Sequence, residues 1–177
     1  MDKVHITLKN KVYRLAWNII CTILFRPSPR RAHNWRSFLL RLFGSKVGKN
    51  VHVYPYAKIW SPINLEIGDS SSIDDFVDCY NVEKIKIGKK VSISKYTFLC
   101  TASHDYHDPD RQLVASGISI GDKTWIASDV FIGPGVNIGN NTTILARVTL
   151  LKSVPSNMKA KHVENYALSL KQKSVND

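Results

Sequence analysis

The sequence predicts a mainly β fold, a parallel β-solenoid of six-residue units preceded by an N-terminal helical hairpin. Two observations predict the solenoid. An aliphatic residue recurs about every six positions through much of residues 47–155, and a small or branched residue follows it four positions later. An aliphatic–glycine pair also recurs along the chain, at Val47-Gly48, Ile67-Gly68, Ile87-Gly88, Ile120-Gly121 and Ile138-Gly139. This period suits a coil with three short faces, and neither an amphipathic helix nor a simple hairpin.

The recurring aliphatic residues are expected to point inward and to stack on their equivalents in the next coil, so that neighbouring strands pair in parallel. The clearest series is Ile120, Ile126, Ile132, Ile138, Ile144 and Leu150. Each glycine is expected near a corner, where an unusual backbone geometry is easiest for it. Extra residues in the early coils are expected around Asn64-Leu65 and Glu83-Lys84.

Residues 1–46 form a separate helical segment in this interpretation. Apolar residues at helical spacing from Val12 to Leu24 predict one helix that Pro27 and Pro29 end, and Ser28 with Pro29 is expected to begin a second helix that Gly44 ends. The apolar faces either cover the solenoid or a neighbouring subunit, or they rest on a membrane surface as a basic amphipathic pair. The apolar run is too short to span a bilayer, which needs about 20 residues.

The net charge of +11 belongs to the two ends of the chain. Residues 1–46 hold ten Lys or Arg residues and a single acidic residue, Asp2, and the tail at 156–177 is also basic. This distribution argues against nucleic-acid binding by the main body, and it fits ends that face anionic phosphates or lipid. Three widely spaced cysteines without a Cys-x-x-Cys pair predict buried free thiols in a reducing compartment. With no secretory signal evident, a cytoplasmic protein is expected.

The ladder breaks at residues 104–117. The interval from Ile87 to Ile120 exceeds one 18-residue coil by 15 residues, so a polar loop leaves the coil at His104 and the ladder resumes at Ile118. Three hypotheses compete for this loop. His104 is a general base whose ring a neighbouring carboxylate or carbonyl orients, or His104 and His107 with nearby aspartates bind a metal, or the loop is merely surface.

Several motifs together resemble the hexapeptide-repeat (left-handed β-helix) acetyltransferases, in particular the sugar O-acetyltransferases of bacterial polysaccharide biosynthesis. The motifs are Phe25-Arg26-Pro27-Ser28-Pro29, Leu42-Phe43-Gly44, Ile67-Gly68-Asp69, Asp78-Cys79-Tyr80-Asn81, Cys100–Asp105 and Trp125–Val136. The resemblance implies a left-handed coil, a homotrimer with active sites between subunits, and acetyl-CoA as co-substrate. No metal is expected.

The resemblance also implies roles for individual residues. His104 removes a proton from the acceptor hydroxyl, and the backbone N–H of Ser128 stabilises the oxyanion. The cofactor lies in a groove near Ala127, Ser128 and the glycine corners, and Trp125 either walls this groove or packs at a coil corner.

The acceptor is expected to meet residues one coil before His104 and on the loop itself. Asp78 and Asn81 either bind the substrate or form corner hydrogen bonds. Asp105 holds or orients the histidine or the sugar. Tyr80 and Tyr106 either stack on a sugar ring or pack within the loop.

The C-terminal region departs from the family pattern. Lys152 and Pro155 remain, but a later glycine and proline are missing and Glu164 adds a negative charge where phosphates would approach. This leaves Lys152, Lys161 and Lys171 as candidates for contacts with CoA, or as part of a solvated basic tail.

The sequence therefore predicts an acetyl-CoA-dependent O-acetyltransferase acting on a sugar hydroxyl of a polysaccharide repeat unit or its precursor. The expected location is the cytoplasm, either free or peripheral at the inner face of the membrane. The alternatives are a non-catalytic scaffold with an eroded CoA site, an N-acetyltransferase of an amino sugar, and a β-helix carbonic anhydrase. The last needs three histidines that His52, His107 and His162 do not supply.

Overall fold

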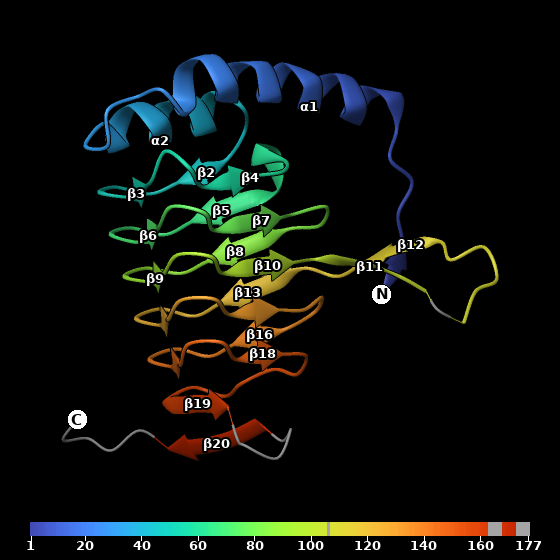
Figure 1. The fold of residues 1–177 in the computed structure, drawn as a ribbon, viewed down its shortest axis with the longest axis vertical. Coiled ribbons are helices and arrows are strands. Elements are labelled where there is room, and N and C mark those ends of the chain that lie inside the picture. Colours follow the sequence, from blue (N-terminus) through green and yellow to red (C-terminus); the bar gives the residue numbers. More distant parts are fainter. Residues whose placement is uncertain (106, 163–167, 173–177) are drawn as a thin grey trace.

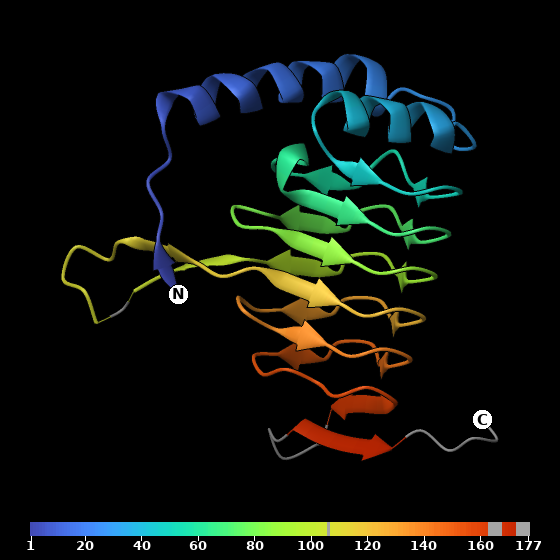
Figure 2. The ribbon, with the colours of Figure 1, turned by 180° about the vertical axis from the view of Figure 1, so that it is seen from behind.

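The protein is a stack of coils with helices across one end and an arm projecting from one side (Figures 1 and 2). This computed structural model describes residues 1–105, 107–162 and 168–172. Of residues 162 and 168–172 it describes the backbone alone. The parallel β-solenoid predicted from the six-residue period is confirmed, because strands of successive coils pair in parallel and in register.

The coils form three sheets, named here the first, second and third faces in chain order. The first face contains β2 (Lys46–Val47), β5 (Leu65–Ile67), β8 (Ile85–Ile87), β13 (Ile118–Ile120) and β16 (Asn137–Ile138). The second contains β3 (His52–Val53), β6 (Ser72–Ile73), β9 (Ser92–Ile93), β14 (Trp125–Ile126), β17 (Thr143–Ile144), β19 (Met158–His162) and the antiparallel β20 (Leu168–Gln172). The third contains β4 (Lys58–Ile59), β7 (Asp78–Tyr80), β10 (Phe98–Cys100), β15 (Phe131–Ile132) and β18 (Thr149–Leu150).

The core is the inward line of aliphatic residues that the sequence predicts. Every member of the series from Ile120 to Leu150 is buried, and so are the small or branched residues that follow at Val130, Val136 and Val148. Ser103 is the exception, because the chain has already left the coil there and its side chain is exposed. The β19 pairing with β17 continues the second face beyond residue 155, where the sequence analysis ends the solenoid.

The recurring glycines are required by close approach between coils. A Cβ on Gly68 would lie 2.6 Å from the carbonyl carbon and oxygen of Gly88 in the next coil. The expected reason, an unusual backbone geometry at the glycine itself, is wrong for these corners. The positive φ angles fall two residues later, at Asn50, Ser70, Lys90, Lys123 and Asn141. We call this corner, between the first and second faces, the glycine edge.

Replacing Gly68 with alanine is therefore expected to destabilise the fold by about 1–3 kcal/mol, since the new methyl meets backbone that cannot move aside. The matched control is Gly133→Ala, whose Cβ would meet the Cδ2 of the exposed Leu151 side chain at 3.0 Å. Denaturant unfolding of both variants is the measurement. Equal losses of unfolding free energy would show that coil-to-coil approach at Gly68 is not the constraint.

Two helices cover the first coil. Helix α1 (Leu8–Ile20) continues as a π-helical turn, η1 (Cys21–Phe25), and α2 spans His33–Leu42. Trp17, Phe25 and Leu40 are buried against the coil, and the Trp17 Nε1 donates to the Ile59 carbonyl at 2.7 Å. These buried residues form the inner face of the helical segment. For this face, the hypothesis that the helices cover the end of the solenoid is correct. No helix in the described part of the chain is long and apolar enough to cross a membrane.

The second helix begins later than predicted. Ser28 does not cap it, because its hydroxyl donates to the Phe25 carbonyl and accepts from Arg36. The fully buried Arg36 donates its remaining N–H groups to the carbonyls of Val53, Pro29 and Arg30, so the turn between the helices is wrapped around one guanidinium. This satisfied charge is the reason that the chain stays irregular until His33.

The loop predicted at 104–117 is a β-hairpin arm. Strand β11 (Ala102–His104) pairs antiparallel with β12 (Leu113–Ala115), and β1 (Asp2–Lys3) adds a third strand beside β12. The arm leaves the solenoid between the third and first faces, which we call the arm edge. The contribution of β1 is a finding that no periodicity in the sequence indicates.

Candidate active site

His104 lies at the outer end of strand β11, with an exposed side chain. Its backbone position is set by antiparallel pairing with Leu113 in β12. The arm is anchored by a small apolar cluster at its base, in which Ala102 and Ala115 are buried and Val4 packs against them.

The His104 ring is oriented by a backbone carbonyl. Its Nδ1 lies 2.6 Å from the Arg111 carbonyl oxygen, which can only accept a hydrogen bond. The proton of the neutral ring is therefore on Nδ1, and Nε2 carries the free lone pair. This is the tautomer that a general base requires, so the geometry supports the first of the three hypotheses for the loop.

The Asp105 carboxylate accepts a hydrogen bond from the His107 backbone N–H at 3.0 Å. Its own N–H donates to the Gln112 carbonyl, which closes the hairpin. Asp105 thus shapes the loop. The group that orients the histidine ring is the Arg111 carbonyl. Tyr106 lies outside the described residues.

Strand β1 makes the arm three strands wide. The Val4 N–H donates to the Leu113 carbonyl at 2.9 Å, and Lys3 forms an exposed ion pair with Asp108 at 3.5 Å. Backbone pairing is the part of this contact that stabilises the arm, because exposed ion pairs contribute little.

A chain lacking residues 2–4 is expected to show faster amide hydrogen exchange across the arm, since β12 then becomes an edge strand. The matched control is Lys3→Ala, which removes only the ion pair and should leave the exchange unchanged. Exchange measured by mass spectrometry tests this. Unaltered protection in the truncated chain would refute the bracing role of β1.

A pocket below α1 brings together two of the predicted substrate-binding residues. Asp78 and Tyr80 of β7 line it with Trp60, and Lys58 and Arg26 add positive charge. Tyr80 meets Trp60 edge to face with ring centroids 5.8 Å apart, and Lys58 lies 3.3 Å from the Asp78 carboxylate.

The same aromatic pair packs against the base of the arm. Trp60, Tyr80 and Leu113 belong to the apolar cluster around Ala102 and Ala115. The pocket therefore lies beside the element that carries His104. Trp60 is a residue that the sequence analysis misses, and its place one coil above Tyr80, at the end of the equivalent strand, was the available signal.

Asn81 is not a substrate-binding residue in this structure. It is fully buried, and its amide both accepts from the Ser61 N–H and donates to the Ser61 carbonyl, at 3.0 and 2.6 Å. Its alternative interpretation, a corner hydrogen bond between coils, is therefore the correct one, because no polar atom of the side chain is left to face a ligand.

Trp125, Ala127 and Ser128 lie together where the second face turns into the third, the corner that we call the serine edge. Trp125 is 49% exposed, and its Nε1 donates to the Ser94 hydroxyl at 3.3 Å. Ala127 is buried and its N–H is taken by the Ile144 carbonyl. Ser128 is exposed, and among the described residues no acceptor opposes its N–H. Ser128 thus has the free donor that an oxyanion site requires.

Two basic residues, Arg147 and Lys159, lie in the two coils that follow Ser128. Arg147 occupies the corner position one coil after Asp129, and its backbone N–H donates to the Ser128 carbonyl at 3.1 Å. Lys159 pairs with Thr143 on the neighbouring strand, and Thr143 pairs with Trp125 on the strand beyond it. Neither cation is among the residues predicted from the sequence, although the 18-residue spacing from Asp129 to Arg147 was a usable signal.

The three predicted lysines are not one cluster. Lys152 follows β18 and is exposed on the arm edge, whereas Lys161 is exposed on β19 in the second face. Lys171 lies in β20 opposite Lys159, and its side chain is outside the described part. Of Lys152 and Lys161, whose side chains are described, Lys161 lies on the face that carries Trp125 and Lys152 does not.

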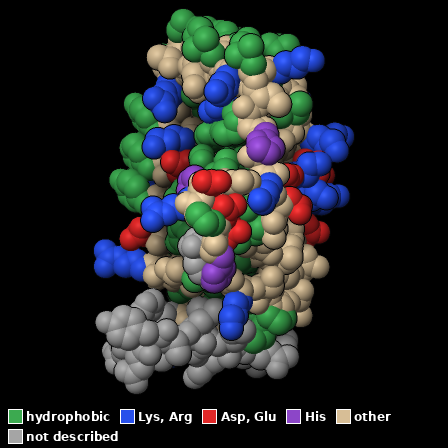
Figure 3. All heavy atoms as spheres, turned by 90° about the vertical axis from the view of Figure 1, so that its right-hand side faces the viewer, with side chains coloured by type: hydrophobic (Ala, Val, Ile, Leu, Met, Phe, Trp, Pro, Cys, Tyr) green, Lys and Arg blue, Asp and Glu red, His purple; other side chains and the backbone are tan. Residues whose placement is uncertain are grey.

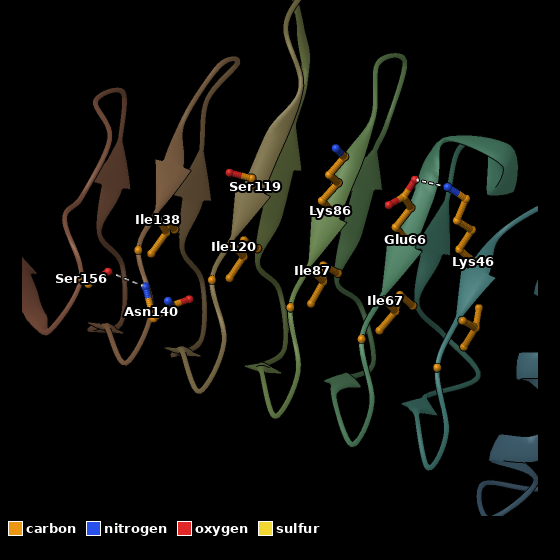
Figure 4. A pocket seen from close by; sticks show the side chains of 16 residues that line it. Lys46, Glu66, Ile67, Lys86, Ile87, Ser119, Ile120, Ile138, Asn140 and Ser156 are labelled. Carbon is orange, nitrogen blue, oxygen red and sulfur yellow. Dashed lines mark hydrogen bonds and ion pairs between the residues drawn. The ribbon is translucent and has the colours of Figure 1, made fainter.

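The glycine edge does not share a groove with Ser128. Figure 4 shows a groove along the first face and the glycine edge, lined by residues such as Ile67, Ile87, Ser119 and Asn140. Neither Ala127 nor Ser128 lines it. The expected groove near both Ser128 and the glycine corners is therefore wrong for a single chain, because these corners are different edges of the solenoid.

His104 and Ser128 are also on different edges. In Figures 1 and 2 the arm projects from the side opposite the strands β3, β6 and β9, with which β14 continues the second face. Within one chain, therefore, the His104 ring on the arm edge and the Ser128 N–H on the serine edge do not face the same space.

The cysteines play no part in this arrangement. All three are free thiols, and Cys21 and Cys79 are buried as predicted, whereas Cys100 is only partly buried. Burial raises the pKa of each thiol, so none is poised as a nucleophile. No group of three His, Cys, Asp or Glu side chains suited to a metal occurs in the part of the chain that the structure describes.

Comparisons with known proteins identify the family of the chain. Residues 117–152 match the bacterial transferase hexapeptide (six repeats) family. The chain is 44% identical over 145 residues to the putative colanic acid biosynthesis acetyltransferase WcaF of Escherichia coli K12, covering 82% of this chain and 79% of the relative.

Solved structures are similar over nearly the whole chain. A maltose O-acetyltransferase from Clostridium difficile 630 is 26% identical with a TM-score of 0.82, covering 97% of this chain and 92% of the other. The hexapeptide-repeat acetyltransferase VCA0836 of Vibrio cholerae O1 biovar eltor, complexed with acetyl-CoA, is 23% identical with a TM-score of 0.81, covering 94% and 90%. The chain therefore belongs to the hexapeptide-repeat acetyltransferases, and it is an acyltransferase.

Proposed function

We propose that this protein is an acetyl-CoA-dependent O-acetyltransferase that modifies a sugar hydroxyl of a polysaccharide repeat unit or its lipid-linked precursor. The observation that carries the proposal is the His104 ring, whose Nδ1 proton is held by the Arg111 carbonyl so that Nε2 is free to accept a proton. The relative named for colanic acid biosynthesis supports the saccharide class of the acceptor.

His104 acts as the base for direct transfer in a ternary complex. Its Nε2 takes the proton of the acceptor hydroxyl while that oxygen attacks the thioester carbonyl of acetyl-CoA. The Ser128 N–H donates to the carbonyl oxygen as negative charge develops there. The C–S bond then breaks, the acetyl group stays on the sugar oxygen, and the proton on His104 passes to the departing CoA thiolate.

The two half-sites, His104 on the arm edge and Ser128 on the serine edge, meet between copies of the chain in this proposal. The arm of one copy reaches the serine edge of the next, and repetition of this contact around an axis closes a homotrimer. The serine edge offers an apolar surface for such a contact. Tyr56, Phe76 and Tyr96 are exposed there and stack in nearly parallel pairs, with centroids 5.4 and 5.2 Å apart.

The acceptor lies in the pocket below α1, beside the arm. Trp60 and Tyr80 present aromatic surface for a sugar ring, and the Asp78 carboxylate accepts hydrogen bonds from its hydroxyls. Acetyl-CoA lies along the serine edge, where Arg147, Lys159 and Lys161 supply positive charge for its phosphates.

His104→Ala is expected to lower kcat at least about a hundredfold, because it removes the general base. The matched control is His107→Ala on the same loop, which should change kcat only a few-fold. Release of free CoA in a screen of candidate sugars and repeat units is the measurement. Near wild-type turnover by His104→Ala would exclude the assigned role.

The assembly makes a separate prediction. Tyr96→Glu is expected to shift the protein from trimer to monomer in analytical ultracentrifugation and to abolish turnover, since it places a charge in the apolar contact. Phe38→Glu, also at an exposed aromatic residue but in α2 and away from both edges, should remain trimeric. A Tyr96→Glu protein that stays assembled would place the contact elsewhere.

A non-catalytic scaffold with an eroded CoA site is the alternative that the divergent tail favours. Calorimetry distinguishes the two: the enzyme is expected to bind acetyl-CoA, with affinity reduced by Arg147→Ala. Absence of acetyl-CoA binding by the intact chain would favour the scaffold. If an amino sugar gives a higher kcat/KM than its hydroxyl counterpart, the activity is N-acetylation.

A further inference from the structure

We propose that the outer face of the two helices docks on the surface of an anionic lipid membrane. This face consists of Leu8, Val12, Leu15, Ile19 and Ile23 along α1 and η1, together with Trp35, Phe38 and Leu42 of α2. It is distinct from the inner face that caps the solenoid. The inference goes beyond the proposed chemistry and does not depend on it.

The outer face is apolar and uncovered in the described chain. Its members on α1 and η1 recur at i, i+4, i+7, i+11 and i+15, which places them on one side of a helix. Their side chains are between 49 and 76% exposed, although Trp17, Cys21 and Phe25 on the opposite side are buried. An amphipathic helix in a globular protein needs one apolar stripe, so the second stripe is unexplained by folding.

Helix α2 extends the same surface. Trp35, Phe38 and Leu42 are exposed at i, i+3 and i+7, and the rings of Trp35 and Phe38 stack with centroids 5.8 Å apart. The Trp35 Nε1 donates to the Leu24 carbonyl, which joins the α2 stripe to the end of η1. Figure 3 shows hydrophobic side chains gathered over this end of the molecule, with Lys and Arg side chains beside them.

Positive charge selects an anionic surface as the partner. Residues 1–46 hold ten Lys or Arg residues against Asp2 alone. Arg30 is committed to Asp74 and Asp75, and Arg36 is buried. Lys9, Lys11 and Arg31 are exposed, and within the described residues none of them has an acidic partner. Basic side chains flanking an apolar helical stripe are the pattern of helices that lie in a membrane interface.

A second copy of the chain fits this surface less well. Two such faces in contact would bring two strongly basic segments together, and like charges at short range repel. The serine edge offers another apolar surface, at Tyr56, Phe76 and Tyr96, that lacks this concentration of charge. Because the outer face covers one end of the solenoid, lateral assembly of copies leaves it free to meet a plane.

The test is co-sedimentation of the full chain with vesicles of phosphatidylcholine containing about one quarter phosphatidylglycerol, against phosphatidylcholine alone. Removal of the helices is unsuitable, because it would also strip the inner face from the core. Leu15→Glu is expected to weaken binding to the anionic vesicles at least about tenfold. The matched control is Leu151→Glu, a Leu of similar exposure outside the helices, which should bind like the wild type.

Loss of binding in Leu15→Glu but not in Leu151→Glu, with thermal unfolding unchanged, supports the proposal. Should Leu15→Glu fail to fold, Lys9→Gln with Lys11→Gln replaces it, and binding should then fall and become less salt-dependent. No binding by the wild-type chain, or equal binding by all variants, overturns the proposal. A Leu15→Glu protein that sediments as a smaller oligomer also overturns it, because the face then belongs to a contact between copies. None of these readouts uses acetyl transfer, so the result is independent of the proposed function.

Discussion

The close stacking of one coil on the next is the constraint on which the rest of the structure depends. Coil-to-coil hydrogen bonds such as the Gly68 N–H to the Ile87 carbonyl, at 2.8 Å, repeat along the whole solenoid. They form only if the corners approach closely, and Gly48, Gly68, Gly88, Gly121 and Gly139 remove the Cβ atoms that would prevent this. Side chains at equivalent positions are thereby stacked into lines, with aliphatic residues inside and functional residues outside.

Stacking also separates the functional groups. A residue stays on its edge because the register does not slip between coils, so His104 on the arm edge and Ser128 on the serine edge cannot be brought together by a local movement. The arm extends the reach of one edge outward, and β1 widens it at the base. In the proposed mechanism the site is therefore built by presenting these edges to other molecules, so that a rigid scaffold can bring two substrates together.

The helical cap presents two apolar faces within 46 residues. Its inner face, with Trp17, Phe25 and Leu40, shields the first coil from water, and the buried Arg36 holds the turn between the helices through backbone carbonyls. Its outer face is apolar as well, and basic residues flank it. Hydrophobic periodicity reports both stripes together, which is why the pattern alone left covering and membrane docking as alternatives.

The sequence by itself determined the parallel solenoid, the identity of the inward residues and the break that carries His104. Each of these follows from a strict six-residue period or from its interruption. Only the tertiary structure decided what each polar residue does. It buried Asn81 against Ser61, turned His104 toward the Arg111 carbonyl, and added β1 to the arm from more than a hundred residues away. It also separated the glycine edge from the serine edge. These outcomes depend on which residues meet across coils and strands, and a repeat of six residues carries no information about such contacts.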